Sequence, residues 1–316
     1  MKIKEIIDFL AELAPTEYQE SYDNAGLIVG NAYVVCTGAL LCLDIMESVL
    51  DDAIEKKCNL IIAHHPIVFF GLKRITGKNY VERVLIKAIK NDIAIYVAHT
   101  NLDNVHVGVN KKMADKLGLQ NCQILSPKKQ VLKKMTLQCE QQYTQKIATV
   151  VADALKDLGI KGQQINEQCI DIVLPSHAES KAYRAAQKIQ TNVTCHSLFL
   201  DNTYAKVGSG MIGFLPEPMP IEEFLLFVKK TMKTGCVRHT ELLKNKVQKV
   251  ALCGGAGSFL LKKAIAKNAD VFITADYKYH EFFDADGRIV IADVGHYESE
   301  QYTIELFYDV LTKKFR

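Results

Sequence analysis

The segment Asn59-Leu60-Ile61-Ile62-Ala63-His64-His65-Pro66 places two histidines directly after a run of apolar residues. A short apolar run of this kind is typical of a strand buried inside a sheet. In α/β proteins, ligand sites lie outside the carboxyl ends of such strands. Neighbouring side chains of an extended segment diverge, so His64 and His65 are better placed to serve two adjacent ions than to chelate one. The alternative is a histidine pair that only caps the strand.

Two further segments repeat this arrangement. His99 and Asp103 follow the apolar run 93–98, and His296 and Glu300 follow the run 288–293. Imidazole and carboxylate groups are ligands suited to zinc, iron or manganese. His296 and Glu300 are four residues apart where a strand passes into a helix, so both can point to the same side. In isolation, Asp103 also fits a turn residue and Glu300 a favourable charge at a helix start.

The three segments together predict a two-metal centre. Two ions about 3.5–4 Å apart need several histidines and at least one carboxylate whose two oxygens can bridge them. Each segment alone is a weak signal, and their conjunction is specific. The candidate metal ligands are His64, His65, Asp103, His296 and Glu300.

Outside these segments, short β-rich runs alternate with helical patterns, which indicates an α/β layer architecture. The strands are expected at 34–44, 59–64, 93–98, 248–253, 270–275 and 288–293, and the helices at 46–57, 80–90, 108–117, 257–267 and 299–314. The more polar middle reads as a small β-α-β-α-β module. We therefore expect a first α/β half at 1–127, an α+β insert at 128–215 and a second half at 216–316 that packs with the first.

Composition excludes several classes of protein. Of the 316 residues, 48% are hydrophobic and 24% are charged, as in ordinary globular proteins. The 39 Lys and Arg against 36 Asp and Glu leave a net charge of +3, too small to indicate nucleic-acid binding. No apolar run approaches a membrane span, and the first 15 residues read as an amphipathic helix rather than a signal peptide. The nine scattered cysteines, none in a CxxC pair, favour reduced thiols and a cytoplasmic location.

Two weaker features carry alternatives. The glycine-rich segment 254–258 lies between a strand and a helix, where it could hold an anion on its N–H groups, although a plain tight turn is the simpler interpretation. His280 could supply an acid/base group near the site, or it could lie on a polar helix face.

The sequence resembles the Ngg-interacting-factor-three-like family, often labelled GTP cyclohydrolase I type-two homologs. The motifs that carry this resemblance cover about 220 residues of both outer parts: Tyr22-Asp23-Asn24-Ala25-Gly26-Leu27, HHPIVF (64–69), HTNLDN (99–104), CGGAGS (253–258), ADVFITADYKYHE (269–281) and DVGHYESE (293–300).

The resemblance implies an α/β fold of two similar halves and a ring-shaped homohexamer, a trimer of dimers. It also implies two divalent ions per subunit, one held by His65 and Asp103 and the other by His64 and His296, with Glu300 as the bridge. His99 then becomes a neighbour of the ions instead of a ligand, and Asp23, Asn24 and His280 lie near the rim. The middle segment resembles a ferredoxin-like insert of the PII/CutA type, in a short form that lacks its glycine-rich motif.

Two functions remain open from the sequence. The first is a metal-dependent hydrolase in which two ions activate a water against a small phosphorylated or nucleotide-like substrate, with His280 or His99 as proton shuttle. The second is a non-catalytic metal-binding scaffold or regulator that binds a protein or a metabolite. Nothing in the residues reads as a guanine pocket, so GTP cyclohydrolase chemistry rests on the family label alone.

Overall fold

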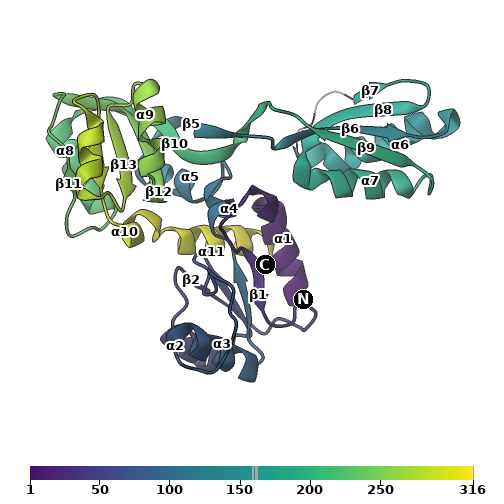
Figure 1. Ribbon diagram of the computed structural model, residues 1–316, viewed down its shortest axis with the longest axis horizontal. Helices are drawn as coiled ribbons and strands as arrows, with labels where there is room; N and C mark the ends of the chain where they lie inside the picture. Colours follow the sequence, from purple (N-terminus) through teal and green to yellow (C-terminus); the bar gives the residue numbers. More distant parts are fainter. Residues whose placement is uncertain (159, 161–162, 316) are drawn as a thin grey trace. The chain divides into compact units, whose positions relative to one another are not determined.

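The computed structural model describes residues 1–158, 160 and 163–315. They form two compact units, a main unit of residues 1–126 and from Lys206 onward, and an insert of Pro127–Ala205 (Figure 1). The predicted end of the insert at residue 215 is therefore wrong, because the insert ends at Ala205. Residues 206–215 continue strand β10 (Thr203–Pro220), which from Met211 on pairs with β12 (Lys246–Ala256) of the main unit.

The first sheet of the main unit has the order β1-β4-β3-β2, in which β2, β3 and β4 are parallel and β1 is antiparallel to β4. Its strands are β1 (Gly26–Val29), β2 (Ala39–Cys42), β3 (Leu60–Ala63) and β4 (Ala94–Val97). The apolar sides of α2 (Glu47–Glu55) and α3 (Tyr80–Lys90) pack on this sheet in one core cluster. The amphipathic start of the chain forms α1 (Ile3–Leu13), followed by the short η1 (Thr16–Tyr18).

The second sheet has the order β11-β14-β13-β12-β10-β5, with β12, β13 and β14 parallel. The strands not yet located are β5 (Gln120–Lys129), β11 (Arg238–His239), β13 (Val271–Ala275) and β14 (Val290–Asp293). Two core clusters cover its two faces. One cluster includes α5 (Val109–Lys116) and α8 (Ile221–Thr231), and the other includes η4 (Ser258–Leu260), α9 (Leu261–Ala266) and η5 (Tyr279–Ala285).

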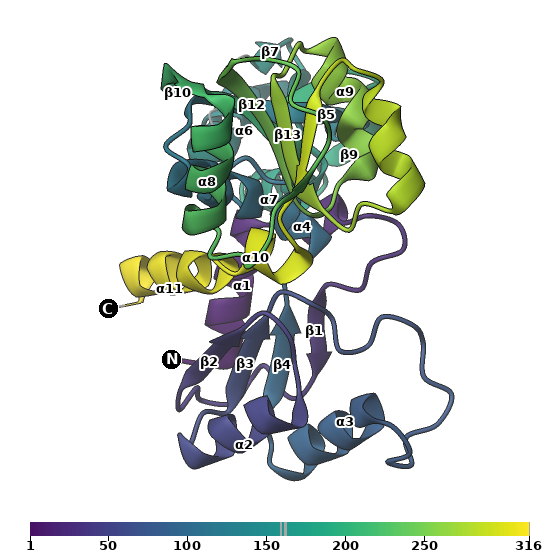
Figure 2. The same cartoon turned by 90° about the vertical axis from the view of Figure 1, so that its left-hand side faces the viewer.

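Three helices lie between the two sheets. Figure 2 shows α4 (Thr100–Asp103), α10 (His296–Glu300) and α11 (Thr303–Lys314) between them. Helix α10 contacts β12 and β13, and α11 contacts β2 and α5. The carboxyl ends of β3, β4 and β14 thus meet at this junction, which confirms the α/β architecture of two halves.

The insert folds as β6 (Leu132–Gln138), α6 (Gln141–Leu155), β7 (Gln163–Ile165), β8 (Cys169–Pro175), α7 (Glu179–Gln187) and β9 (Thr194–Phe199), with the short η2 (Lys156–Leu158) and η3 (Ser176–Ala178). Its sheet order is β7-β8-β6-β9, with every neighbouring pair antiparallel. This is the β-α-β-β-α-β ferredoxin-like arrangement. The predicted β-α-β-α-β order missed β7, whose sequence Gln-Gln-Ile lacks an apolar run. The closer likeness to PII/CutA-type modules stays a prediction.

Candidate metal centre

All five predicted metal ligands lie together at the junction of the two sheets. His64 and His65 follow β3, Asp103 ends α4 after β4, and His296 and Glu300 are the first and last residues of α10 after β14. The carboxyl ends of β3 and β4 in the first sheet and of β14 in the second sheet face the same junction, so residues more than 200 positions apart become neighbours.

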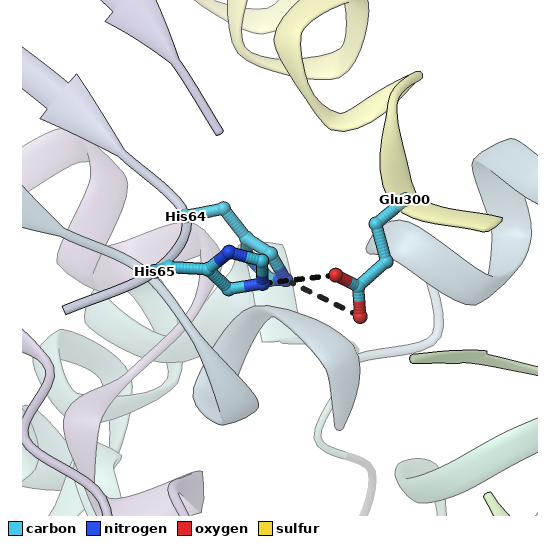
Figure 3. A group of neighbouring side chains, drawn as sticks. All are labelled: His64, His65 and Glu300. Atoms are coloured by element: carbon cyan, nitrogen blue, oxygen red, sulfur yellow. Dashed lines mark hydrogen bonds and ion pairs between the residues drawn. The ribbon is translucent and has the colours of Figure 1, made fainter. Parts of the chain in front are cut away.

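The Glu300 carboxylate contacts all three histidines of the cluster, and Figure 3 shows His64 and His65 pointing toward it. Its Oε2 lies 2.9 Å from His65 Nε2 and 3.1 Å from His296 Nε2, and its Oε1 lies 3.8 Å from His64 Nε2. His64 Nε2 is also 3.6 Å from Asp103 Oδ1. His64, His65 and Glu300 each offer a ligand atom within 4.8 Å of the others, close enough to hold a metal ion together. The neighbouring residues His64 and His65 therefore each lie closest to a different oxygen of the Glu300 carboxylate.

The second nitrogen of each ring has its own acceptor. His64 Nδ1 donates to the carbonyl oxygen of Ala98 at 2.8 Å, His65 Nδ1 to Asp44 Oδ1 at 2.8 Å, and His296 Nδ1 to Asp276 Oδ2 at 2.6 Å. An acceptor at Nδ1 fixes the neutral tautomer in which Nε2 carries the lone pair, as metal-binding histidines require. The three Nε2 atoms are thus aimed at the same space, where each would offer its lone pair to a cation.

Two buried polar atoms of this cluster, His64 Nε2 and Asp103 Oδ1, have no hydrogen-bond partner among the residues that the structure describes. An unpartnered buried polar atom costs about 1–3 kcal/mol, so a group that satisfies both atoms is expected. A cation does so, because an imidazole nitrogen and a carboxylate oxygen are both electron-pair donors. The donor set of three imidazoles and two carboxylates suits zinc, iron or manganese alike.

The electrostatics of the cluster favour positive charge. Burial alone would lower the pKa of His64, but the Asp103 and Glu300 carboxylates raise it to about 9. The hydrogen bond to Glu300 raises the pKa of His296 to about 10. Burial opposes ionisation of Glu300, yet the three imidazoles hold its pKa well below the usual range. Cations bound here would take the place of these protons.

A glycine makes room for Glu300. A Cβ built on Gly255 would lie 2.5 Å from Glu300 Oε1. The N–H groups of Gly254 and Gly255 donate to Asn110 Oδ1 and Ser299 Oγ, each at 2.9 Å. These two N–H groups are therefore already engaged, and the missing side chain at Gly255 leaves the space that the Glu300 carboxylate occupies.

The two predicted proton shuttles are placed differently. The His99 ring lies 5.3 Å from the His64 ring and 5.6 Å from the His65 ring, and its Nδ1 donates to Asp23 Oδ1 at 2.7 Å. His280 is exposed on η5, where its ring packs against Tyr279 and Phe283. Within the described residues, no contact joins His280 to the cluster.

The sequence analysis missed Asp44 and Asp276, which orient His65 and His296. Both residues follow the end of a strand, Asp44 after β2 and Asp276 after β13. The same signal that singled out the ligands could therefore have found them. Asp23, which the resemblance placed near the rim, accepts hydrogen bonds from His99 and from the Thr100 N–H at 3.0 Å.

Comparison with known proteins shows which family this chain belongs to. The family model described as Duf34/NIF3 (NGG1p interacting factor 3) matches residues 1–316. The chain belongs to the DUF34/NIF3 family. Proteins named "GTP cyclohydrolase 1 type 2 homolog" resemble this DUF34/NIF3 chain, one from Staphylococcus epidermidis at 30% identity (94% of this chain, 89% of that protein) and one from Bacillus subtilis at 31% (93% and 88%).

A solved DUF34/NIF3 structure has the same fold. The Bacillus cereus protein related to NIF3 is 30% identical, has a TM-score of 0.81, and is matched over 100% of this chain and 94% of that chain. The family and the α/β fold expected from the sequence are thus confirmed. In the described residues, no helix is long and apolar enough to span a membrane.

Proposed function

We propose that this protein is a metal-dependent hydrolase that acts on a small phosphorylated or nucleotide-like substrate. The observation that supports the proposal is that three histidine Nε2 atoms converge on one buried carboxylate. Two buried atoms of the cluster that could bind a cation, His64 Nε2 and Asp103 Oδ1, also have no hydrogen-bond partner among the described residues. His64, His65, Asp103, His296 and Glu300 would hold two divalent cations, bridged by Glu300. The resemblance pairs His65 with Asp103, whereas the nearest contacts pair His64 with Asp103 and bring His65 and His296 to one oxygen.

Each group of the chain has a task in such a reaction. When bound, divalent cations would lower the pKa of a coordinated water and stabilise negative charge on the phosphoryl oxygens. Ala98, Asp44 and Asp276 keep three imidazoles in the metal-binding tautomer. His99, held by Asp23 and with its ring 5.3 Å from the His64 ring, would accept the proton of the attacking water. As the new P–O bond forms, the ester P–O bond breaks and the leaving alcohol takes up the proton that His99 accepted from the water.

The test compares two variants of α10 after loading with Mn²⁺, Zn²⁺ or Fe²⁺. Glu300→Ala should lose bound metal and at least 100-fold in hydrolysis of bis(4-nitrophenyl) phosphate and 4-nitrophenyl phosphate. Glu298→Ala removes the same charge from the same helix and should keep both properties. Metal content is measured by elemental analysis and turnover by release of nitrophenolate. Full activity of Glu300→Ala would refute the hydrolase, and metal binding without turnover of any phosphoester would favour the scaffold.

We also propose the homohexamer that the resemblance implies. The mass of the particle in solution, measured by light scattering, tests it against a monomer or dimer.

A further inference from the structure

Three aromatic side chains beside the candidate metal centre are exposed to solvent. Tyr22 is 63%, Phe69 38% and Phe70 80% exposed. Their rings form a connected group, with centroids 6.1 Å apart for Tyr22 and Phe69 and 5.0 Å apart for Phe69 and Phe70. Large aromatic side chains left open in this way mark binding surfaces more often than chance contacts.

This aromatic group reaches the histidines of the centre directly. The Phe69 ring lies 6.4 Å from the His99 ring, which is 5.6 Å from the His65 ring. The path from the open rings to a candidate metal ligand therefore crosses one side chain. A ligand that lies on the aromatic group and extends past His99 arrives at the metal centre.

Hydrogen bonds of neighbouring residues fix the chain segments that carry Tyr22 and Phe69. Asp23, next to Tyr22, accepts from the Thr100 N–H and from His99, and the N–H of Glu20 donates to Thr100 Oγ1 at 2.9 Å. Asn24 Nδ2 donates to the carbonyl oxygen of Val68, next to Phe69, at 2.7 Å. The segments that carry both rings are thus tied to each other and to the turn after β4. A preordered surface of this kind loses little entropy when a ligand binds.

We propose that Tyr22, Phe69 and Phe70 form a stacking platform for a planar heteroaromatic ring of the substrate. The proposal rests on the proposed function and narrows its substrate class to phosphate esters that carry such a ring, as nucleotides do. The Tyr22 and Phe69 rings already contact each other at a tilt of 42°, so the substrate ring stacks on an outer face rather than between them. Stacking accepts any base, because every base has a π-face, while the phosphate turns toward the cations.

The experiment measures binding of adenosine 5′-monophosphate and ribose 5-phosphate to the Mn²⁺-loaded protein by titration calorimetry. The two probes share the phosphate and differ by the base. The wild-type protein should bind the nucleotide at least five-fold more tightly. Tyr22→Leu and Phe70→Leu, which keep an apolar side chain but remove the ring, should each reduce this preference severalfold and leave metal content unchanged. Phe283→Leu is the matched control, because Phe283 is also 63% exposed but lies on η5.

Adenosine provides an arm that needs no metal. In chelator-treated protein, its purine protons should receive magnetisation in saturation-transfer NMR from the wild type and Phe283→Leu, and much less from Phe70→Leu. This result would support the stacking platform even if the protein hydrolyses no phosphoester. Equal affinity for adenosine 5′-monophosphate and ribose 5-phosphate, or an equal adenosine signal in all variants, would overturn the platform. Either result would leave the proposed metal centre unaffected. A change in particle mass in Phe70→Leu with an unchanged nucleotide preference also overturns it, because the rings would then form a contact between subunits.

Discussion

At Gly255 the backbone has a φ of 63°, and the space that a side chain would fill belongs to the Glu300 carboxylate. A residue with a Cβ at this position has two costs. The left-handed conformation costs roughly 1–3 kcal/mol for a non-glycine residue. The new methyl group also displaces the oxygen that faces His64.

Gly287 separates these two costs. It has a φ of 61°, and no atom lies within 4 Å of a Cβ built there. We expect Gly255→Ala and Gly287→Ala to lower the free energy of unfolding, with only Gly255→Ala losing metal affinity, by roughly ten-fold or more. Urea unfolding in the presence of a chelator gives the first quantity and competition with a metal indicator gives the second. Equal metal affinity in the two variants would show that the close approach to Glu300 has no effect on the site.

Asp23 makes stability depend on pH. Burial would raise its pKa, but hydrogen bonds from His99 and Thr100 lower it to about 2, below the 3.8 of an unfolded chain. A depressed pKa stabilises the folded state above about pH 3.8, and this stabilisation is lost as the pH falls toward 2. In metal-free protein, we expect Asp23→Asn to be less stable than the wild type by up to about 2 kcal/mol at pH 6.

This difference in the free energy of unfolding should shrink steadily between pH 4 and pH 2. Urea titrations of both proteins at each pH measure it. A gap that stays constant over this range would mean that the carboxylate of Asp23 is not stabilised in its charged form by the fold.

At the scale of elements, the ends of parallel strands account for what the sequence could predict. Strands β3, β4, β12, β13 and β14 are apolar runs, so their positions were expected to within a few residues. The predicted ligands follow β3, β4 and β14, so their positions in the sheet order were predicted as well. The expected strand at 34–44 is reduced to β2, because only Ala39–Cys42 pairs with β3.

Other elements gave no such signal. Strand β5 contains Pro127 and two lysines, and β10 contains glycines and prolines that usually mark turns, so neither was expected. Their place in the second sheet depends on pairing with neighbours distant in sequence, which a local pattern does not encode. The same limit explains why the sequence did not predict that Tyr22 and Phe69 lie beside the site. Their proximity to His99 arises from the packing of three separate segments.

At the scale of the molecule, every predicted metal ligand and its orienting carboxylate belongs to the main unit. The insert has its own core cluster, which includes Met135, Ile147 and Ile172, and it supplies none of these residues. The chain leaves the main unit through β5 and returns through β10, and these strands are neighbours in the second sheet. A short linker from β5 to β10 can therefore replace the insert while the two strands remain neighbours in that sheet.

We expect a variant in which a Gly-Ser linker replaces residues 128–204 to bind metal with the stoichiometry and affinity of the full chain. Elemental analysis and indicator competition measure both quantities, and far-ultraviolet circular dichroism checks that the main unit is folded. The matched control carries Glu300→Ala in the shortened chain and should bind no metal at the site. Loss of metal from a folded shortened chain would mean that the insert takes part in forming the centre, and it would shift the search for a ligand-binding surface from the strand ends to the insert.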